Sequence, residues 1–555
     1  MVMDGKLPDR SAATNGSTIS VEKVFEDPKN RRRFLQAMGA AGIVGVAGCL
    51  GGDDDDDADP GEDIGDTMVL NAVQRFGTHD PAKGSDYTQV MSMVNLYDPL
   101  IFPDEDGEVQ PHLAEDWDVS DDGLEFTFYL RDDVTFHSGN ELTADDVAFS
   151  LERFLELGEG NSSLLADFVQ PDGVTIEGDY ELTMELEQVY APFLSVLTLL
   201  FVVDEDEVRG DGDEWGSEAL DGADAGSGPF ELDTFDPGSH VIWSRYHDYW
   251  QDPPDGAFEN IRCEIIDEDS TVRSLIRTGE LHMTSQYQSE ETYNTLEDDD
   301  GLYIQEDATA TLLYFKMNTQ IEPTDDPEVR KAIAYGFDYE QARTEISPGS
   351  EQAVGPVAPV FEEHNPDVEQ PTYDPEYAQE ILADAGYDEG ELEIVFTHVR
   401  DDDMQEMNAL LFQENMQQIG IDVDINPQTW GTMTELATSV DETPHVNHVF
   451  YGPTYPSVDA YLFNQYHSNA AGTWMSMEHL ADDEVDSLVD EARAEVDDDE
   501  RAELYRQAQA RIAELYPSIY LFVETQRLGF NESVRGYTFR PAMSFDFWFH
   551  EYYAE

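Results

Sequence analysis

Segments with the period-two hydrophobic pattern of strands alternate along this chain with segments that have the period of helices. The strand-like segments are residues 124–130, 180–186 and 312–317, and the helix-like segments are residues 143–157, 327–335, 375–385, 406–418 and 500–513. Thr143 and Asp374 have the character of helix N-caps, and Gly386 and Gly420 that of helix stops. Alternation of this kind over about 490 residues predicts an α/β protein with two or three domains.

The segment before these patterns has the layout of an export signal. Three arginines at residues 31–33 precede a short apolar run at residues 37–48, which ends in the small residues V-A-G directly before Cys49. A basic region, an apolar region and a small-residue cleavage site follow one another in this order in secretory signals. Paired arginines mark the twin-arginine route, which carries folded cargo. A membrane-spanning helix is disfavoured, because the hydrocarbon core needs about 20 apolar residues.

The segment resembles a twin-arginine signal joined to a lipoprotein cleavage box. In lipoproteins the cysteine of the box becomes the first residue and carries the lipid, so we expect residues 1–48 to be removed and Cys49 to be lipidated. Residues 49–66 then form an acidic tether that stays disordered, because the five aspartates at residues 53–57 cannot bury apolar surface. A calcium loop is disfavoured, since it needs alternating oxygen donors and a turn glycine. The mature protein is expected on the outer face of the cell membrane.

The charge of the chain limits its surroundings and partners. The sequence has 28 Lys+Arg against 122 Asp+Glu, a net charge of -94, and three lysines follow Cys49: Lys83, Lys316 and Lys331. Hydrophobic residues at 40% and aromatic residues at 11% are sufficient for packed cores, so a disordered chain is disfavoured. Such dispersed acidity resembles haloarchaeal proteins, which work at molar salt, where the Debye length is about 3 Å. Nucleic acid is excluded as a partner, since no basic stripe could neutralise phosphates.

The usual sequence patterns of catalytic and metal sites are absent. There is no G-x-S-x-G elbow, phosphate loop, H-E-x-x-H helix or paired C-x-x-C. Cys263 lies in an alternating strand-like run and is expected to be a buried, inert thiol. His445 and His448 are three residues apart, but Pro444 favours a loop or strand, so we expect solvated surface histidines rather than metal ligands. We therefore predict a protein that is not an enzyme and has no cofactor and no metal.

Short phrases in a fixed order are the most specific feature of the sequence. The first are YDPL at 97–100, HLAEDW at 112–117, DDGLEFTFYLR at 121–131, VTFHSG at 134–139 and LTADDVAFSLER at 142–153. Later ones are APF at 191–193, GSGPF at 226–230, HDYW at 247–250, DPEVRKAIAY at 326–335, YDP at 373–375, AGY at 385–387, IGIDV at 419–423, and residues 501–510 with Pro517. Over residues 67–545 they closely resemble the extracellular solute-binding proteins of the family 5 type, the peptide and nickel class of ABC importer receptors.

The resemblance implies an α/β fold of the two-lobed periplasmic-binding-protein type, type II, in the large peptide-receptor class. Lobe one would be discontinuous, with residues 67–311, including an extra subdomain, and a C-terminal return at residues 529–555. Lobe two would take residues 312–528. The lobes would close on the solute by hinge bending.

The resemblance also implies a function. The chain would be a monomeric receptor that captures a di- or oligopeptide between its lobes and delivers it to the ABC permease subunits in the membrane. An oligosaccharide, a metal chelate or another polar solute is the alternative ligand. An exported hydrolase is disfavoured by the missing catalytic motifs, and a structural surface protein by the absence of repeats and Ser/Thr-rich stalks.

Candidate ligand residues follow from the same resemblance. In peptide-binding relatives, an aspartate in a W-x-x-D-Y-x-x-P segment pairs with the peptide amino terminus, and Thr454 stands at its place here. Asp459, five residues on, is either a substitute acid or a cap of the next helix. Arg400 falls within a residue of the arginine that some dipeptide receptors set against the ligand carboxylate; a surface arginine is the alternative.

Four aromatic residues are candidate walls of the cleft: Trp430, Tyr451, Tyr455 and Trp474. Aromatic side chains offer a large contact area at a low entropy cost, which suits a ligand site. Packing in a core is the alternative for each of them.

Overall fold

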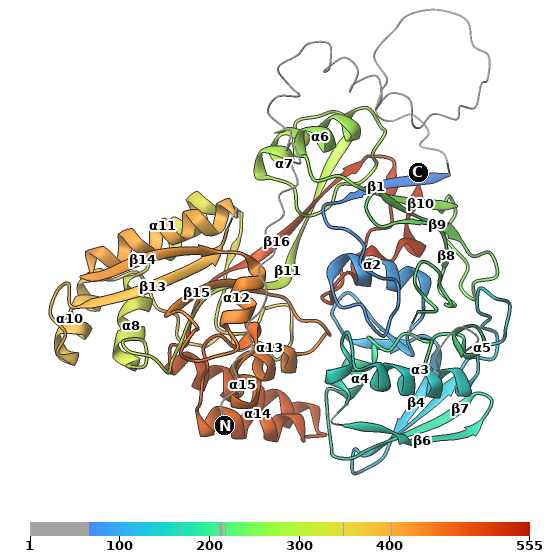
Figure 1. The fold of residues 1–555 in the computed structure, drawn as a ribbon, viewed down its shortest axis with the longest axis horizontal. Helices are drawn as coiled ribbons and strands as arrows, with labels where there is room; N and C mark the ends of the chain where they lie inside the picture. Colours follow the sequence, from blue (N-terminus) through green and yellow to red (C-terminus); the bar gives the residue numbers. More distant parts are fainter. Residues whose placement is uncertain (1–65, 167, 210–214, 217, 348, 401) are drawn as a thin grey trace, which may run out of the picture. The chain divides into compact units, whose positions relative to one another are not determined.

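The computed structural model describes residues 66–555, except residues 167, 210–214, 217, 348 and 401 (Figure 1). The predicted signal at residues 1–48, the lipidation site Cys49 and the tether up to residue 65 lie outside the described residues. The described residues all belong to one compact unit. Within it, hydrophobic side chains form one large core and several further clusters, which define two lobes.

The largest core joins distant parts of the chain. It combines buried side chains of residues 68–283 with those of residues 528–552, and Tyr455 and Ala460 reach into it from lobe two. We call the elements of this core lobe one. Phe545, Phe547 and Phe549 are fully buried in it, so the C-terminal residues return to a core that the N-terminal part began.

The main sheet of lobe one has the strand order β1-β10-β9-β8. Its strands are β1 (Thr67–Ala72), β10 (Asn260–Ile265), β9 (His240–Arg245) and β8 (Phe230–Asp236), with β1 and β10 parallel. In β10, Ile261 and Cys263 are buried while their neighbours are partly exposed, which is the alternation of a strand with one covered face. The prediction of a buried thiol at Cys263 is confirmed.

A second, antiparallel sheet forms a separate layer of lobe one, with the order β4-β5-β7-β6. Its strands are β4 (Ala114–Val119), β5 (Glu125–Leu130), β7 (Glu181–Leu186) and β6 (Val169–Gly178), and α3 (Ala144–Leu157) packs against it. Both predicted strands and the predicted helix are confirmed here. Thr143 and Asp146 form a reciprocal capping box at the start of α3, as the sequence suggested.

Short elements complete lobe one. They are α2 (Tyr87–Leu96), β2 (Ile101–Pro103), β3 (Val109–Pro111), α4 (Phe193–Leu197), α5 (Glu205–Arg209), α6 (Asp269–Arg277), α7 (Glu290–Glu297), β17 (Val534–Arg535) and β18 (Tyr553–Ala554).

Lobe two contains a six-stranded sheet with the order β12-β16-β11-β15-β13-β14. The strands are β12 (Glu351–Gln352), β16 (Ser518–Asn531), β11 (Leu302–Met317), β15 (Val446–Tyr451), β13 (Leu392–Val399) and β14 (Ile421–Gln428). β13 runs parallel to both β14 and β15, whereas β11 is antiparallel to β15 and β16.

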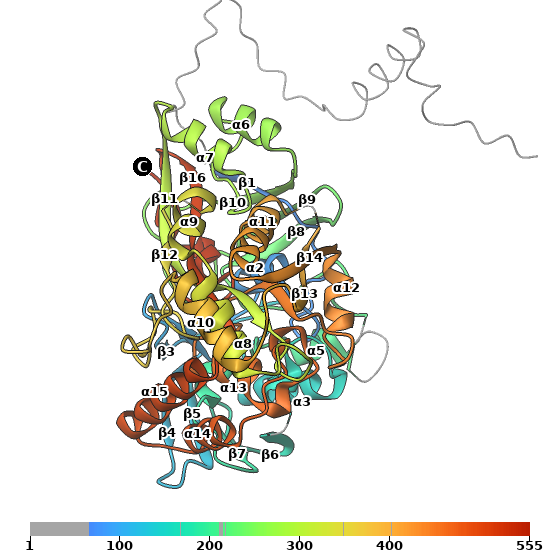
Figure 2. The ribbon, with the colours of Figure 1, turned by 90° about the vertical axis from the view of Figure 1, so that its left-hand side faces the viewer.

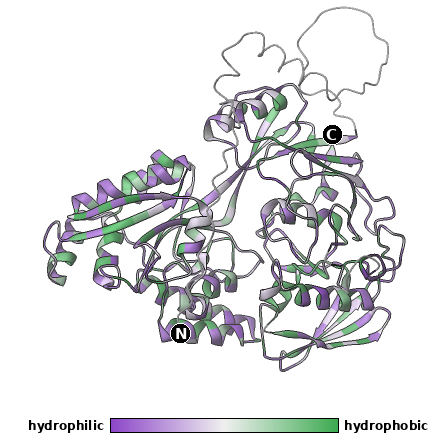
Figure 3. Cartoon of the chain, viewed as in Figure 1, coloured by the Kyte–Doolittle hydropathy of each residue, from purple (hydrophilic) through white to green (hydrophobic). Residues whose placement is uncertain are grey.

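Helices cover both faces of this sheet. In β11, Leu313, Phe315 and Met317 point into one core, with α8 (Pro327–Gly336), α10 (Pro375–Ala385) and α11 (Asp403–Gln418). Leu312 and Tyr314 point into the other, with α13 (Val458–Tyr466), α14 (Asp483–Arg493) and α15 (Asp498–Glu514). Figure 3 shows hydrophobic and hydrophilic residues alternating along these helices, as one-sided burial requires. The remaining helices are α9 (Tyr339–Gln341) and α12 (Trp430–Leu436).

The helix predictions for lobe two are confirmed at 327–335, 375–385, 406–418 and 500–513, although α11 begins earlier, at Asp403. Gly386 ends α10 in the left-handed conformation, with φ 95°. The expectation of solvated histidines was wrong for His448, which is fully buried beside Phe315, at 4.9 Å between ring centroids. Burial lowers the pKa of His448 to about 3. His445 is half-buried, and its two ring nitrogens bond to the backbone of Val395 and Glu322.

The strands β11 and β16 lie side by side and pass from one lobe to the other (Figures 1 and 2). Residues 519–523 of β16 pack in lobe two, while Leu528 and Phe530 pack in the core of lobe one. Their ladder changes register between Ala308 and Leu312, where the Thr309 hydroxyl instead donates to the carbonyl of Glu524 at 2.9 Å. Bending disturbs few contacts where a ladder between two cores is interrupted. We therefore call residues 308–312 of β11 and 523–525 of β16 the hinge.

Candidate ligand site at the hinge

The parallel strands of lobe two end at one edge of their sheet. β13 is followed by Arg400, β14 by Thr429 and Trp430, and β15 ends at Tyr451. In open α/β sheets, ligands bind outside the carboxyl ends of parallel strands. Tyr451 is paired with Leu312 of β11, so this edge adjoins the hinge. The topology thus brings residues that are distant in sequence to one place, which we call the hinge edge.

Three predicted aromatic residues meet at the hinge edge. Trp430 is 40% exposed and lies edge-on to the half-buried Trp474, with ring centroids 5.1 Å apart. Tyr451 lies 6.0 Å from Trp474 but is buried, and its hydroxyl donates to the carbonyl of Ala460 at 2.7 Å. Trp430 and Trp474 therefore have accessible surface at the hinge edge, whereas Tyr451 packs against Trp474 from the core.

The predicted polar residues of the hinge edge have unused bonding capacity. Arg400 is exposed; its backbone N–H donates to Gln428 at 2.7 Å and its guanidinium to the carbonyl of Pro427 at 3.2 Å. No carboxylate among the described residues pairs with it. Thr454 is half-buried, and no described residue bonds to its hydroxyl. In this arrangement the Arg400 guanidinium can donate hydrogen bonds to a carboxylate of a ligand.

The predicted pair Tyr455 and Asp459 belongs to a different, buried cluster. Asp459 is 0% exposed, accepts hydrogen bonds from Tyr455 at 2.9 Å and Tyr190 at 3.2 Å, and forms an ion pair with Arg493 at 3.1 Å. Burial raises the pKa of Asp459, although Arg493 opposes this effect. Ser457, not Asp459, caps α13. One carboxylate oxygen accepts from both tyrosines and the other faces Arg493 in the ion pair, so a ligand role for the buried Asp459 would require this cluster to rearrange.

The same cluster connects the lobes. Tyr190 belongs to the core of lobe one, whereas Asp459 and Arg493 lie on α13 and α14 of lobe two. The guanidinium of Arg493 stacks over Phe463 at 3.6 Å and lies 5.0 Å from the ring of Tyr190. The backbone N–H of Ala191 donates to the carbonyl of Arg493 at 2.8 Å. We call Asp459, Arg493, Tyr190 and Tyr455 the lobe-contact cluster.

The sequence did not predict three further residues that influence one another electrostatically near the hinge: Glu524, Asp402 and Tyr287. Glu524 lies on β16, and its side chain is exposed. Desolvation by the surrounding protein nevertheless raises the pKa of its carboxyl to about 7, and the charge of Asp402 raises it further. Asp402 caps α11, and burial raises its pKa as well. Tyr287 of lobe one is 43% exposed, and its pKa is raised by burial and by the charge of Glu524. No local sequence pattern marks these residues, because their proximity arises only from the fold.

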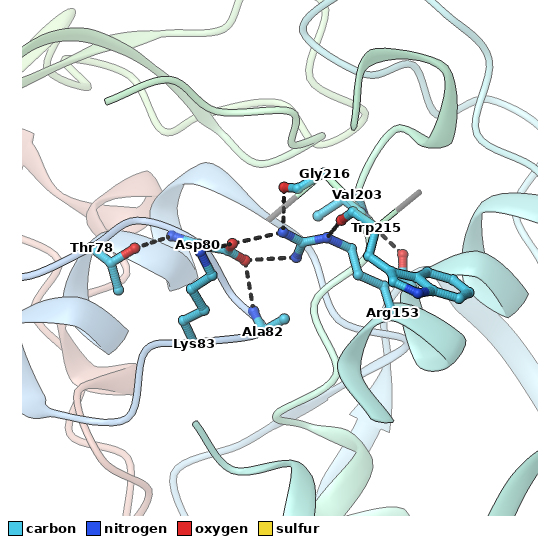
Figure 4. Close-up of polar contacts among 9 residues, drawn as sticks. Thr78, Asp80, Ala82, Lys83, Arg153, Val203, Trp215 and Gly216 are labelled. Atoms are coloured by element: carbon cyan, nitrogen blue, oxygen red, sulfur yellow. Dashed lines mark hydrogen bonds and ion pairs between the residues drawn. The ribbon is translucent and has the colours of Figure 1, made fainter. Parts of the chain in front are cut away.

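The Arg153 guanidinium of lobe one is buried in a structural site (Figure 4). It forms two hydrogen bonds of 2.6 Å with Asp80 and donates to the carbonyls of Trp215 at 2.8 Å and Gly216 at 3.2 Å. The Asp80 carboxylate also accepts from the backbone N–H of Ala82 at 3.0 Å. This network ties the segment after β1 to α3, and so explains why arginine ends the phrase LTADDVAFSLER.

Neither a metal site nor a membrane-spanning helix is found in the part of the chain that the structure describes. In residues 66–555 with the stated gaps, no three His, Cys, Asp or Glu side chains come together as a metal site. Over the same residues, no helix has both the length and the apolar character that crossing a membrane requires.

Comparison with known proteins identifies the family. A family model described as "Bacterial extracellular solute-binding proteins, family 5 Middle" matches residues 108–473. The chain belongs to this family. The expected α/β fold with two lobes of the periplasmic-binding type is confirmed, and this family 5 protein is an extracellular solute-binding receptor rather than an enzyme.

The relatives of this family 5 protein include receptors for different solutes. "Di/tripeptide-binding protein 2" of Pseudomonas aeruginosa is 28% identical over 496 residues, which cover 84% of this chain and 91% of the relative. The periplasmic binding protein DppA from Helicobacter pylori, solved with the peptide STSA, has a TM-score of 0.75 at 24% identity, covering 88% and 98% of the two chains. NikZ from Campylobacter jejuni, solved with Ni(L-His), also has a TM-score of 0.75, at 20% identity and 88% and 99% coverage.

Proposed function

We propose that this protein captures di- or oligopeptides at the hinge edge, between lobe one (residues 67–311 and 529–555) and lobe two (residues 312–528), and delivers them to ABC permease subunits. The di/tripeptide-binding relative supports this ligand class. Closure follows because a ligand that contacts both lobes binds the closed state better than the open one. The receptor acts as a monomer, which light scattering at molar salt tests.

Arg400 carries the proposal that the solute is a peptide. The chain has few cations, and most described arginines pair with carboxylates. Arg400 is exposed at the carboxyl edge of the sheet, and no described carboxylate pairs with it. A guanidinium binds a carboxylate in bidentate geometry, as the C-terminus of a peptide requires. Trp430 and Trp474 beside it supply apolar area for side chains.

Calorimetry with a panel of short peptides tests this function. Arg400→Ala should weaken binding by about 1.5 to 3 kcal/mol, because it removes a charge-assisted hydrogen bond. Arg343→Ala is the matched control, since Arg343 is a partly exposed arginine paired with Glu340 on the same helical segment. Thr454→Asp should tighten binding if this position faces the peptide amine. Peptide should also reduce the radius of gyration in solution scattering.

The absence of heat with every peptide would contradict the peptide function. A metal chelate is then the next candidate, because the Ni(L-His) receptor NikZ shares the fold at the same TM-score as the peptide-bound DppA. An oligosaccharide or another polar solute follows it. Titration with nickel and L-histidine distinguishes the chelate directly.

We further propose that the protein is a haloarchaeal-like lipoprotein, exported by the twin-arginine route and anchored through Cys49 on the outer face of the membrane. Residues 31–33 and the V-A-G-C box support this proposal. Cys49→Ser should release the protein into the medium. Membrane retention of this variant, equal to that of the wild type, would contradict the anchor.

A further inference from the structure

We propose that Glu524 is a specificity-determining residue of the solute site and receives a positively charged group of the ligand at the hinge, in place of the acid that is absent at Thr454. This inference rests on the proposed function, because it assumes that a solute binds at the hinge edge. It goes further by assigning the chemical class of one end of that solute, an ammonium or guanidinium group.

The position of Glu524 in the ladder places its side chain at the junction of the lobes. Its neighbours Val523 and Thr525 pair with Leu312 and Ala308 of β11, so three residues of β11 bulge opposite Glu524. Residues before it pack in lobe two, and residues after it pack in lobe one. A charge carried here lies between the cores of the two lobes, where a ligand enclosed by both lobes could reach it.

The surroundings of Glu524 are those of a recess rather than of an open surface. The side chain is exposed to water, yet surrounding protein raises the pKa of its carboxyl to about 7. Asp402, the cap of α11 in lobe two, adds to this shift. On the other side, Tyr287 of lobe one is close enough for the charge of Glu524 to raise the pKa of its phenol. Glu524 is thus reached by water and lies between the cores of the two lobes, as a residue that lines the space between them would.

Glu524 lacks the cationic partner that three buried carboxylates of this chain have. Asp80 is paired with Arg153, Asp459 with Arg493, and Glu478 with Lys316. No residue that the structure describes forms a hydrogen bond or an ion pair with the Glu524 carboxylate. A carboxylate that protein surrounds next to a second carboxylate is unfavourable until a proton or a cation neutralises it. Because the residues that the structure describes supply no such cation, we assign the ligand this role.

The ligand cation has two possible sources, the free amino terminus of a peptide or a Lys or Arg side chain. Both place a positive charge with N–H donors against the carboxylate and satisfy the same site. The aromatic surface of Trp430 and the guanidinium of Arg400 at the hinge edge would then contact the apolar and anionic parts of the same ligand.

The test is calorimetry on the full mature receptor at molar salt with three peptides of equal length: one with a free amino terminus, its N-acetylated form, and an N-acetylated form that contains lysine. Glu524→Gln should lower the affinity for the free-amine peptide about tenfold or more and leave the affinity for the neutral acetylated peptide unchanged. Glu524→Asp keeps the charge and should retain the preference. Glu185→Gln, an exposed carboxylate on β7, is the control and should bind like the wild type. Circular dichroism verifies that each variant is folded.

Proton release gives a second readout that a purely structural role would not change. A bound cation stabilises the carboxylate form, so it lowers the pKa of Glu524 from about 7 and expels a proton. Affinity for the free-amine peptide should therefore rise with pH through neutrality, and heats in two buffers of different ionisation enthalpy should reveal the released proton. Asp402 and Tyr287 interact electrostatically with Glu524, so the release must disappear in Glu524→Gln to be assigned to Glu524.

The outcomes separate this inference from the function on which it rests. Binding of free-amine peptide that is unaffected by Glu524→Gln, or equal binding of the free and neutral acetylated peptides, would overturn the role of Glu524 and leave the peptide function in place. No heat from any peptide with the wild type would overturn both. Preference for the acetylated lysine peptide over the neutral one supports a side-chain cation as the source.

Discussion

Replacing Arg493 with methionine should destabilise this protein strongly, because it leaves the Asp459 carboxylate buried without a cation. Asp459 is 0% exposed and its ion-pair partner Arg493 is 14% exposed. Removal of one partner of a buried pair typically lowers the free energy of unfolding by about 3 to 5 kcal/mol. Methionine retains packing against Phe463 but loses the cation over that ring, which lies 3.6 Å from the guanidinium carbon. We therefore expect a loss near the upper part of that range.

Substitution of the other partner of the ion pair, Asp459→Asn, should lower the free energy of unfolding by less. The asparagine oxygen still accepts from Tyr455 or Tyr190, and Arg493 reaches water in part. The expected loss is about 1.5 to 3 kcal/mol, the range for hydrogen bonds to charged groups. Tyr190→Phe removes only one of these bonds, from the lobe-one side, and should cost about 1 kcal/mol.

The loss in Arg493→Met should depend on pH in a defined direction. Burial already raises the pKa of Asp459, and the substitution removes the opposing charge, so the pKa rises further. A carboxyl whose folded pKa exceeds its unfolded value, about 3.9, is stabilised by protonation in the folded state. The deficit relative to the wild type should therefore shrink as the pH falls from neutral through the raised pKa.

Urea unfolding followed by fluorescence and circular dichroism at molar salt measures these differences. Arg343→Met is the control, because Arg343 pairs at the surface with Glu340. Equal stabilities of Arg493→Met and the wild type at neutral pH would refute the reasoning. A deficit that grows on acidification would refute the assignment to Asp459.

Three further outcomes are expected. The fold should be lost below roughly molar salt, because the chain has 122 acidic and 28 basic residues and low salt no longer screens the repulsion between the acids. A cooperative, equally stable fold at about 50 mM salt, measured by circular dichroism, would contradict this. Lys316→Met should lower the free energy of unfolding by about 3 to 5 kcal/mol, since Lys316 and Glu478 are both fully buried, and adding Glu478→Leu should restore most of it in urea unfolding. Cys263 should not react with a thiol reagent at pH 8 in the native protein but should react after unfolding, because burial raises the pKa of its thiol.

Local sequence patterns were sufficient for several elements of this fold. The helix at residues 143–157 was readable because its apolar period and its capping residues lie within a few positions of one another. The same holds for the alternation around Cys263. The ordered phrases identified the family, since each one encodes a turn, cap or strand of a shared scaffold. Arg153, which ends one phrase, is such a scaffold residue.

Burial was harder to read from the sequence. Pro444 correctly indicated that His448 is not helical, but β15 is covered on both faces, so its period of two does not distinguish inside from outside. His448 was therefore misplaced at the surface. Asp459 and Arg493 are distant in sequence, and neither position predicts an ion pair without the packing of α13 against α14.

The sequence by itself determined the family, several strands and helices, and the candidates Arg400, Thr454 and Trp430, whose ligand roles stay predictions. Only the tertiary structure decided which carboxylate stands at the hinge. Glu524 carries no motif, and its environment depends on Asp402 and Tyr287, which come from different lobes. The physical reason is that helix and strand patterns arise from neighbours along the chain, whereas the charge balance of a cleft is a sum over side chains that only the completed fold brings together.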